Sequence, residues 1–200
     1  MMKNRFNFIG ALFLTALLLT AGLSNARENY KLDANKSSLK ISGTSTLHDW
    51  HMVAGKYDCN VESAFDGSKD LMISKVIFKC NTNSISSDNS IMDAKAREAL
   101  KSDQFDDIIF QTTSENKIIV DGGTINGWLG GELQIAGQKS TSKLPIKGVI
   151  DTEGNVNVRG EITIRMSSYK MKPPTAMMGT IKTGDEITIH YEFFFSPNNR

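Results

Sequence analysis

The sequence has few of the residues on which catalytic and metal sites are built. Its 200 residues include three histidines, two cysteines and four prolines. It contains no Gly-x-Ser-x-Gly nucleophile elbow and no glycine-rich phosphate loop. Charge of one sign is also scarce, because 23 Lys and Arg balance 22 Asp and Glu without a basic stripe. The sequence therefore gives no support to an enzyme, and it argues against nucleic acid as a partner, since phosphate binding depends on clustered cations.

The only long apolar run is near the N-terminus, and it is short for a membrane span. Two cations precede the uncharged residues 6–19, and the small residues Ser-Asn-Ala follow at 24–26. A spanning helix needs about 20 apolar residues, whereas this pattern is typical of a secretory signal. We predict that residues 1–26 are a signal cleaved after about Ala26, and that residues 27–200 form one periplasmic domain.

Beyond the signal, apolar and polar residues alternate with a period of two in segment after segment. The apolar faces are formed by Leu39 and Ile41; Val53, Cys59 and Val61; Val76, Phe78 and Cys80; Ile108 and Phe110; Ile125, Leu129, Leu133 and Ile135; Leu144, Ile146 and Ile150; Val156, Val158, Ile162, Ile164 and Met166; and Ile187, Ile189, Tyr191, Phe193 and Phe195. Glycine-bearing turns are expected at 121–123, 153–155 and 183–185. The pattern predicts an all-β antiparallel fold of about eight strands. We favour a closed up-and-down barrel over a sandwich, because closure removes exposed edges.

Several glycines fall on the inward-facing parity of these strands. Glycine at such positions leaves interior volume unfilled, which favours a cavity over a solid core. The alternative is that they mark bulges or bends that let the sheet curl. The positions are Gly43, Gly127, Gly131, Gly148 and Gly160.

A single helix is expected between the strands. Ser90 and Asp93 have the spacing of a capping box, and Met92, Ala96 and Leu100 recur at helical intervals. This predicts about three turns with one apolar stripe. Such a helix either covers an end or mouth of the barrel or packs against its outside.

Cys59 and Cys80 are the only cysteines. An even number in an exported domain favours a disulfide, and both lie on the apolar parity of their strands. We predict that they are bridged, with two buried free thiols as the alternative.

Four separated blocks of the sequence resemble the YceI-like family. They are Met92–Arg97, Gly131–Gly137, the double proline 173–174 and Lys182–Glu186. The resemblance extends from Tyr30 to Phe195. It implies a secreted lipocalin-like barrel with a long apolar tunnel for isoprenoid lipids, and hence a binding protein with no cofactor besides its lipid.

The ligand of such a barrel would meet apolar side chains of the interior and a methionine-rich mouth, since methionine adapts to irregular apolar surfaces. Contact with a membrane surface can accompany lipid exchange, and the chain can be a monomer or a homodimer. The candidate ligand-binding residues are Val76, Phe78, Met92, Phe105, Phe110, Leu129, Leu133, Ile164, Met166, Met171, Met177 and Met178.

Two other functions stay open. His48 and His51 have metal-ligand side chains, although residues three apart on a strand point to opposite faces. A metal-dependent enzyme is therefore the weaker alternative to a turn in which Asp49 caps backbone amides and Trp50 packs at the barrel rim. The other alternative is a structural or stress-related exported barrel with a solid interior.

Overall fold

The computed structural model describes residues 28–65 and 70–198. The expected signal at residues 1–26 lies outside this part of the chain. The strands are β1 (Glu28–Leu32), β2 (Ser38–Ser45), β3 (Trp50–Ala54), β4 (Tyr57–Phe65), β5 (Leu71–Asn81), β6 (Ile85–Ser86), β7 (Asp107–Thr112), β8 (Asn116–Asp121), β9 (Thr124–Ile135), β10 (Gln138–Ile150), β11 (Val156–Arg165), β12 (Thr175–Ala176) and β13 (Ile181–Pro197). The α-helix is α1 (Ser90–Leu100), and the short 3-10 helices are η1 (Thr82–Ser84), η2 (Met166–Tyr169) and η3 (Met177–Gly179).

Eight strands close into an antiparallel barrel. The strands β1, β4, β5, β7, β9, β10, β11 and β13 are hydrogen-bonded neighbours in this order, and β13 pairs with β1 to complete the circle. The closing register places Leu32 opposite Phe195. β8 extends the wall between β5 and β9. The expected fold class, an all-β up-and-down barrel with one short helix, is confirmed.

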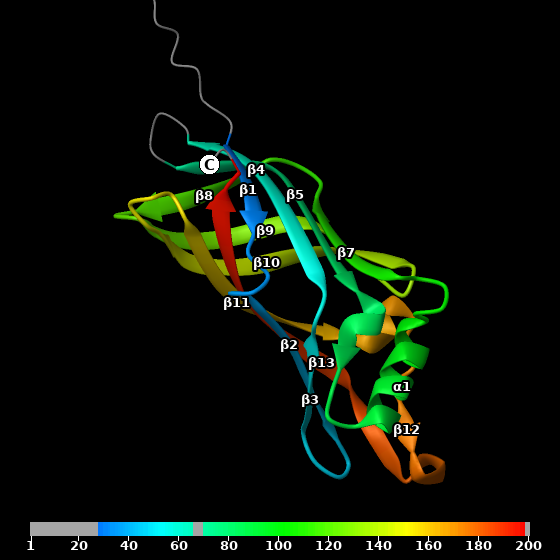
Figure 1. Cartoon of the computed structure of the whole chain (residues 1–200). Helices are drawn as coiled ribbons and strands as arrows, with labels where there is room; N and C mark the ends of the chain where they lie inside the picture. The colour runs from blue at the N-terminus through cyan, green and yellow to red at the C-terminus, as the bar shows by residue number, and fades with distance from the viewer. Residues whose placement is uncertain (1–27, 66–69, 199–200) are drawn as a thin grey trace, which may run out of the picture.

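Along the edge opposite β11, the last strand, β13, is long enough to pair with two strands in turn. Its C-terminal end pairs with β1, whereas its residues 183–192 pair with β2. β2 pairs with β3, and β3 pairs with β6. These strands extend the wall beyond the closed part of the barrel, and the β2–β3 hairpin and β12 lie at the end of the molecule away from the C-terminus (Figure 1).

Two of the three expected turns are present. Gly122, Gly123 and Gly154 have φ values of 54°, 82° and 82°, which glycine adopts without a steric penalty. The third turn, which was expected at 183–185, is absent, so that prediction is wrong. Residues 183–185 lie inside β13, where the pairing with β2 shifts register, and a Cβ at Gly184 would lie only 2.6 Å from the Thr44 hydroxyl. That glycine therefore permits a close approach at a bulge.

The inward parity was also wrong on one strand. Met52 and Ala54 are buried, whereas Val53 is 43% exposed. β3 ends at Ala54 and β4 begins at Tyr57, so the alternation read from β4 does not carry back through the break. In β4 itself Cys59 is buried as expected.

The helix begins one residue earlier than its expected cap implies. Asn89 is the N-cap, and its side chain accepts hydrogen bonds from the amides of Ile91 and Met92 at 3.0 and 3.1 Å. Asp93 bonds instead to Ser87, whose amide and hydroxyl both donate to it at 2.7 Å. The predicted stripe of Met92, Ala96 and Leu100 packs against the core, so α1 faces the barrel interior.

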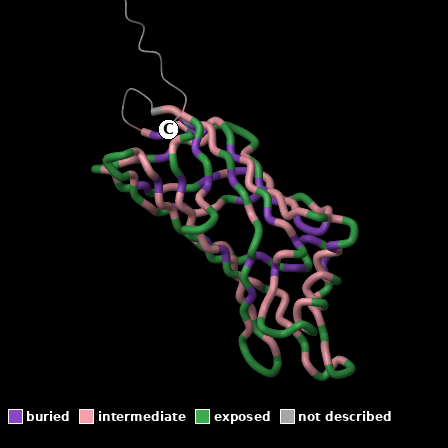
Figure 2. The backbone as a smooth tube through the Cα atoms, in the orientation of Figure 1, coloured by how far each residue is buried: buried purple, intermediate pink, exposed green. Residues whose placement is uncertain are grey.

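Buried residues lie along the barrel, whereas the tip of the β2–β3 hairpin is exposed (Figure 2). The buried residues are the inward members of the alternating strands, such as Phe110, Ile118 and Ile125. Within residues 28–65 and 70–198, no helix has the length and apolar character needed to cross a membrane.

The inward glycines do not create open space. A Cβ at any of the five would come within 3.2 Å of a neighbouring atom. At Gly43 the neighbour is the ring of Trp50, and at Gly160 the neighbours are the carbonyl oxygen of Pro145 and the phenol of Tyr191. At Gly148 it is the backbone of β11. The proposed link between these glycines and cavity volume is therefore wrong, because neighbouring rings and strands occupy the places that their side chains would fill.

Candidate functional site

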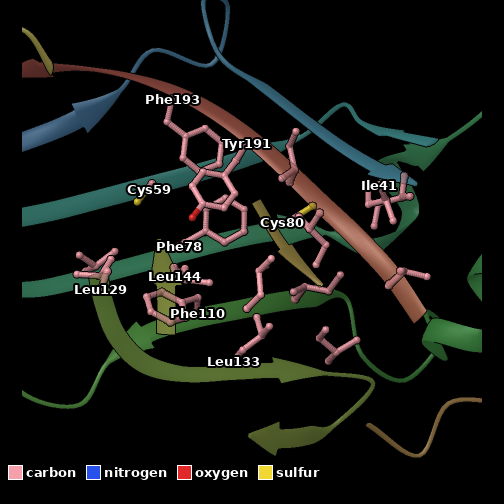
Figure 3. A pocket seen from close by; sticks show the side chains of 18 of the residues that line it. Ile41, Cys59, Phe78, Cys80, Phe110, Leu129, Leu133, Leu144, Tyr191 and Phe193 are labelled. Atoms are coloured by element: carbon pink, nitrogen blue, oxygen red, sulfur yellow. The ribbon is translucent and has the colours of Figure 1, made fainter. Parts of the chain in front are cut away.

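The barrel nevertheless contains a partly open cavity of about 280 Å³. Its walls come from the barrel strands, from β2 and β3, and from α1, which covers one side. The lining is almost wholly apolar, and Figure 3 shows leucine, isoleucine and aromatic side chains converging on the space. A barrel with a solid interior does not describe this molecule.

Eight of the twelve candidate ligand-binding residues line the cavity. They are Val76, Phe78, Met92, Phe110, Leu129, Leu133, Met166 and Met171. The other four do not line it. Phe105 packs over Gly137, Ile164 is buried outside the lining, and Met177 and Met178 are exposed on η3. Whether the eight contact a ligand stays a prediction.

An aromatic cluster occupies one wall of the cavity. The ring of Phe193 lies 5.6 Å from those of Phe78 and Tyr191 and 5.7 Å from that of Tyr57. Phe78, Tyr191 and Phe193 line the cavity, and their rings lie together in Figure 3. Tyr191 and Phe193 were absent from the predicted site although they share its inward parity. Parity places both residues inside, but only the closure of the barrel brings them beside Phe78, because β13 and β5 do not pair.

The Tyr191 hydroxyl forms a hydrogen bond within the protein and does not point a free polar group at the cavity. It donates a hydrogen bond to the carbonyl of Pro145 on β10, and its ring covers Gly160. Burial raises the pKa of this phenol above its ordinary value. The phenol therefore stays neutral, and its ring presents an apolar face to the cavity.

Few polar groups reach the cavity. Ser63, Lys95 and Thr183 are among its lining residues. Lys95 Nζ lies 3.0 Å from Glu98 Oε2. Ser63 is 1% exposed, and within the described part of the chain its Oγ has no hydrogen-bond partner. An unpaired buried hydroxyl costs about 1–3 kcal/mol. The cavity thus suits a molecule that is apolar over most of its length and carries few polar atoms.

The two cysteines are free, so the expected disulfide is wrong. The reason is the register between β4 and β5, in which Cys59 faces Phe78 and Cys80 faces Tyr57. The cysteines are diagonal neighbours, and such positions lie roughly 7–8 Å apart, which is too far for a disulfide without backbone movement. Both thiols line the cavity, and Figure 3 shows the two sulfur atoms apart.

Both thiols are expected to be inert in the folded protein. Burial raises the pKa of Cys59 and of Cys80 to about 12, so at pH 8 only about one thiol in 10,000 is a thiolate, the reactive form. A thiol-reactive dye should label neither cysteine within minutes in native buffer, and should label both promptly in guanidinium chloride. Rapid native labelling of either residue would contradict the buried placement.

The histidines of the β2–β3 hairpin do not form a metal site. His48 Nδ1 donates to the carbonyl of Asp49 at 2.7 Å, and His51 is exposed on β3. Among the described residues, no three His, Cys, Asp or Glu side chains are placed to share an ion. His190 lies elsewhere on the outer surface, where its Nδ1 is 3.2 Å from Glu161 Oε2. The arrangement brings no third ligand to His48 and His51.

The turn interpretation of this hairpin is correct in part. Ser45, and not Asp49, caps the turn, because its Oγ accepts from the amides of Leu47 and His48 at 3.2 Å. Trp50 Nε1 donates to the carbonyl of Thr44 at 3.0 Å. The Trp50 ring packs on Gly43 and lines the cavity, as a rim residue would.

Solved structures share this fold at low sequence identity. BcnA of Burkholderia cenocepacia is 15% identical with a TM-score of 0.63, over 82% of this chain and 98% of that one. A polyisoprenoid binding domain from Saccharophagus degradans, implicated in plant cell wall breakdown, is 11% identical with a TM-score of 0.60, over 84% and 98%. The YceI protein of Campylobacter jejuni is 16% identical with a TM-score of 0.53, over 74% and 85%.

No curated protein matches the chain. The sequence profile of the YceI-like domain, in contrast, matches residues 30–195. This range includes all or most of every strand that closes the barrel, and all but the first two and last three residues of the described chain. The chain therefore belongs to the YceI-like family.

Proposed function

We propose that the protein binds a polyisoprenoid or a similar long-chain amphiphilic lipid inside the barrel. The observation that carries the proposal is the partly open cavity inside the barrel, whose lining is almost wholly apolar. The kinship with a structure described as a polyisoprenoid binding domain supports the choice of lipid class. The lipid chain would contact the eight cavity-lining candidates together with Tyr191 and Phe193.

The energetics suit a reversible carrier. Burial contributes about 0.8 kcal/mol per CH₂, so each five-carbon isoprene unit leaving water contributes on the order of 3–4 kcal/mol. A bilayer offers the chain nearly the same gain. Transfer between the bilayer and the cavity is then close to neutral, and the protein can take up or deliver lipid without a catalytic group.

The place of this activity follows from the N-terminal segment. We infer that residues 1–26 direct export and that the barrel works in the periplasm. The support is the sequence pattern of two cations, an apolar stretch and small residues before the expected cleavage point. N-terminal sequencing of the protein from the periplasmic fraction checks this, and a chain that starts at Met1 and stays in the cytoplasm would contradict it.

Organic extraction of the purified protein tests the proposed lipid. Mass spectrometry of the extract should detect a polyprenyl or other long-chain lipid in near-stoichiometric amount. The comparison is the double variant Leu133→Trp and Ile41→Trp, in which both changes are at cavity-lining positions. Its extract should contain much less of that lipid. Repeated recovery of no apolar ligand, together with no binding of added polyprenyl lipid, would contradict the proposal.

A further inference from the structure

Large exposed apolar side chains gather at one end of the molecule. Met177 is 73% exposed and Met178 is fully exposed on η3. Leu47 projects from the β2–β3 hairpin, and Ile91 from the first turn of α1. The hairpin and β12, the strand that precedes η3, lie at the lower end in Figure 1, and Figure 2 colours these tips as exposed. We call Leu47, Ile91, Met177 and Met178 the apolar tip.

The segments that carry this tip are tied together. The Thr46 amide donates to the carbonyl of Lys182 at 3.0 Å, and its hydroxyl donates to the carbonyl of Thr180 at 3.3 Å. The hairpin that carries Leu47 is thereby held against the segment that follows Met177 and Met178. Both methionines have left-handed φ values, 51° and 54°, which cost a side-chain-bearing residue about 1–2 kcal/mol each. The fold thus maintains a costly turn that leaves both side chains in solvent.

The apolar tip adjoins the cavity. Pro174 and Thr183, on either side of the methionine turn, line the cavity. Met92 and Lys95 of α1 line it too, and Met92 directly follows Ile91 of the tip. A lipid chain that leaves the cavity between α1 and the start of β13 would emerge beside the exposed methionines.

The segment that carries the two methionines is cationic, whereas Asp49 follows Leu47 and Asp88 and Asp93 flank Ile91. Between Arg165 and Asp185 this segment contains Lys170, Lys172 and Lys182 and no acidic residue. All three lysines are exposed. Asp185, the next acid, accepts two hydrogen bonds from Ser167. Exposed apolar side chains flanked by cations are complementary to a bilayer with anionic headgroups, which attract Lys and Arg near the surface.

We propose that the apolar tip docks onto the surface of a bilayer that contains anionic phospholipid. Leu47, Met177 and Met178 enter the boundary between headgroups and acyl chains, while Lys170, Lys172 and Lys182 lie among the headgroups. The docking surface surrounds the route by which a chain reaches the cavity, and in this respect the proposal rests on the proposed lipid binding.

Vesicle flotation of the exported protein, without the expected signal at residues 1–26, tests this docking. The vesicles are phosphatidylcholine alone or phosphatidylcholine with roughly 30% phosphatidylglycerol, an anionic lipid. The pair Met177→Ser and Met178→Ser should lower the partition coefficient about tenfold on both kinds of vesicle. The triple change of Lys170, Lys172 and Lys182 to Gln should remove the preference for anionic vesicles, about fivefold per lysine.

The control removes two other exposed apolar side chains, away from the tip. Ile119 and Trp128 are each 62% exposed on the outer surface of β8 and β9, and the pair Ile119→Ser and Trp128→Ser should bind vesicles like the parent protein. Equal losses in the control and methionine pairs, or no vesicle binding by the parent, would overturn the docking proposal.

Lipid content of the same preparations separates the two proposals. A methionine pair that keeps its extractable lipid but no longer floats with vesicles supports docking through an intact lipid-binding barrel. Vesicle binding that depends on the tip in a protein that never holds lipid would support docking while contradicting the proposed function.

Discussion

Replacing both Leu133 and Ile41 with tryptophan is expected to weaken binding of a polyprenyl lipid by roughly 300-fold. The two residues line the cavity from β9 and β2, and they lie apart around it in Figure 3. The added indole rings would fill space that otherwise holds about one isoprene unit, worth on the order of 3–4 kcal/mol. Titration of the purified variants with a fluorescent polyprenyl analogue measures the change in Kd.

A tryptophan on the outer surface is the control for this result. Val149 is 53% exposed on β10, so Val149→Trp adds the same ring without entering the cavity and should leave Kd unchanged. Circular dichroism should show the same strand content in all variants. A folded double variant that binds lipid as tightly as the parent would show that the chain lies elsewhere.

Replacing Gly148 with alanine is expected to destabilise the barrel by about 3 kcal/mol. The glycine lies in β10, which pairs with β9 on one side and β11 on the other. An added Cβ would collide with the carbonyl of Asn157 and would lie 2.9 Å from the Cα of Val158. Because these are backbone atoms of a paired strand, no side chain can move aside. The melting temperature should fall by about 6–12 °C.

Gly55 provides the matched substitution. A Cβ there would lie 3.4 Å from the nearest atom, the carbonyl oxygen of Ser84, and Gly55 belongs to no strand. Gly55→Ala should therefore change the free energy of unfolding by less than about 0.5 kcal/mol. Equal melting temperatures for the two variants would mean that β10 and β11 are not packed as described.

Alternation carried most of the fold prediction. Apolar residues at every second position, such as Leu129, Leu133 and Ile135, identify the inner face of a strand without knowledge of its neighbours. Trp128 has the opposite parity to Leu129, so it is expected on the outer face, and it is 62% exposed. Parity fails where a strand breaks, as between Val53 and Cys59, because a break resets the inward side.

Contacts between residues on different strands could not be predicted from the alternation. Whether Cys59 meets Cys80 or Phe78 depends on the register of β4 with β5, and a shift of two residues leaves the parity of both strands unchanged. The space around an inward-facing glycine could not be predicted from the alternation either. Sequence shows that Gly148 and Gly160 face inward, but only the structure shows that a neighbouring strand or the Tyr191 ring already fills their space.

The methionine-rich segment was predicted to form a single mouth, but its methionines lie on two different surfaces. Met171 lines the cavity, whereas Met177 and Met178, a few residues later, point into solvent. The left-handed turn at Met177 and Met178 separates them, and a turn of this kind is hard to anticipate where neither residue is glycine. The structure thus divides the expected mouth into a lining residue and an exposed tip.

The most direct measurement is the electron density inside the barrel in crystals of protein loaded with a polyprenyl lipid. A continuous tube of density should run from the side covered by α1 past Leu133 and Phe110 to the aromatic cluster of Phe78, Tyr191 and Phe193. A cavity without lipid density, or one closed by these side chains in new positions, would contradict the account.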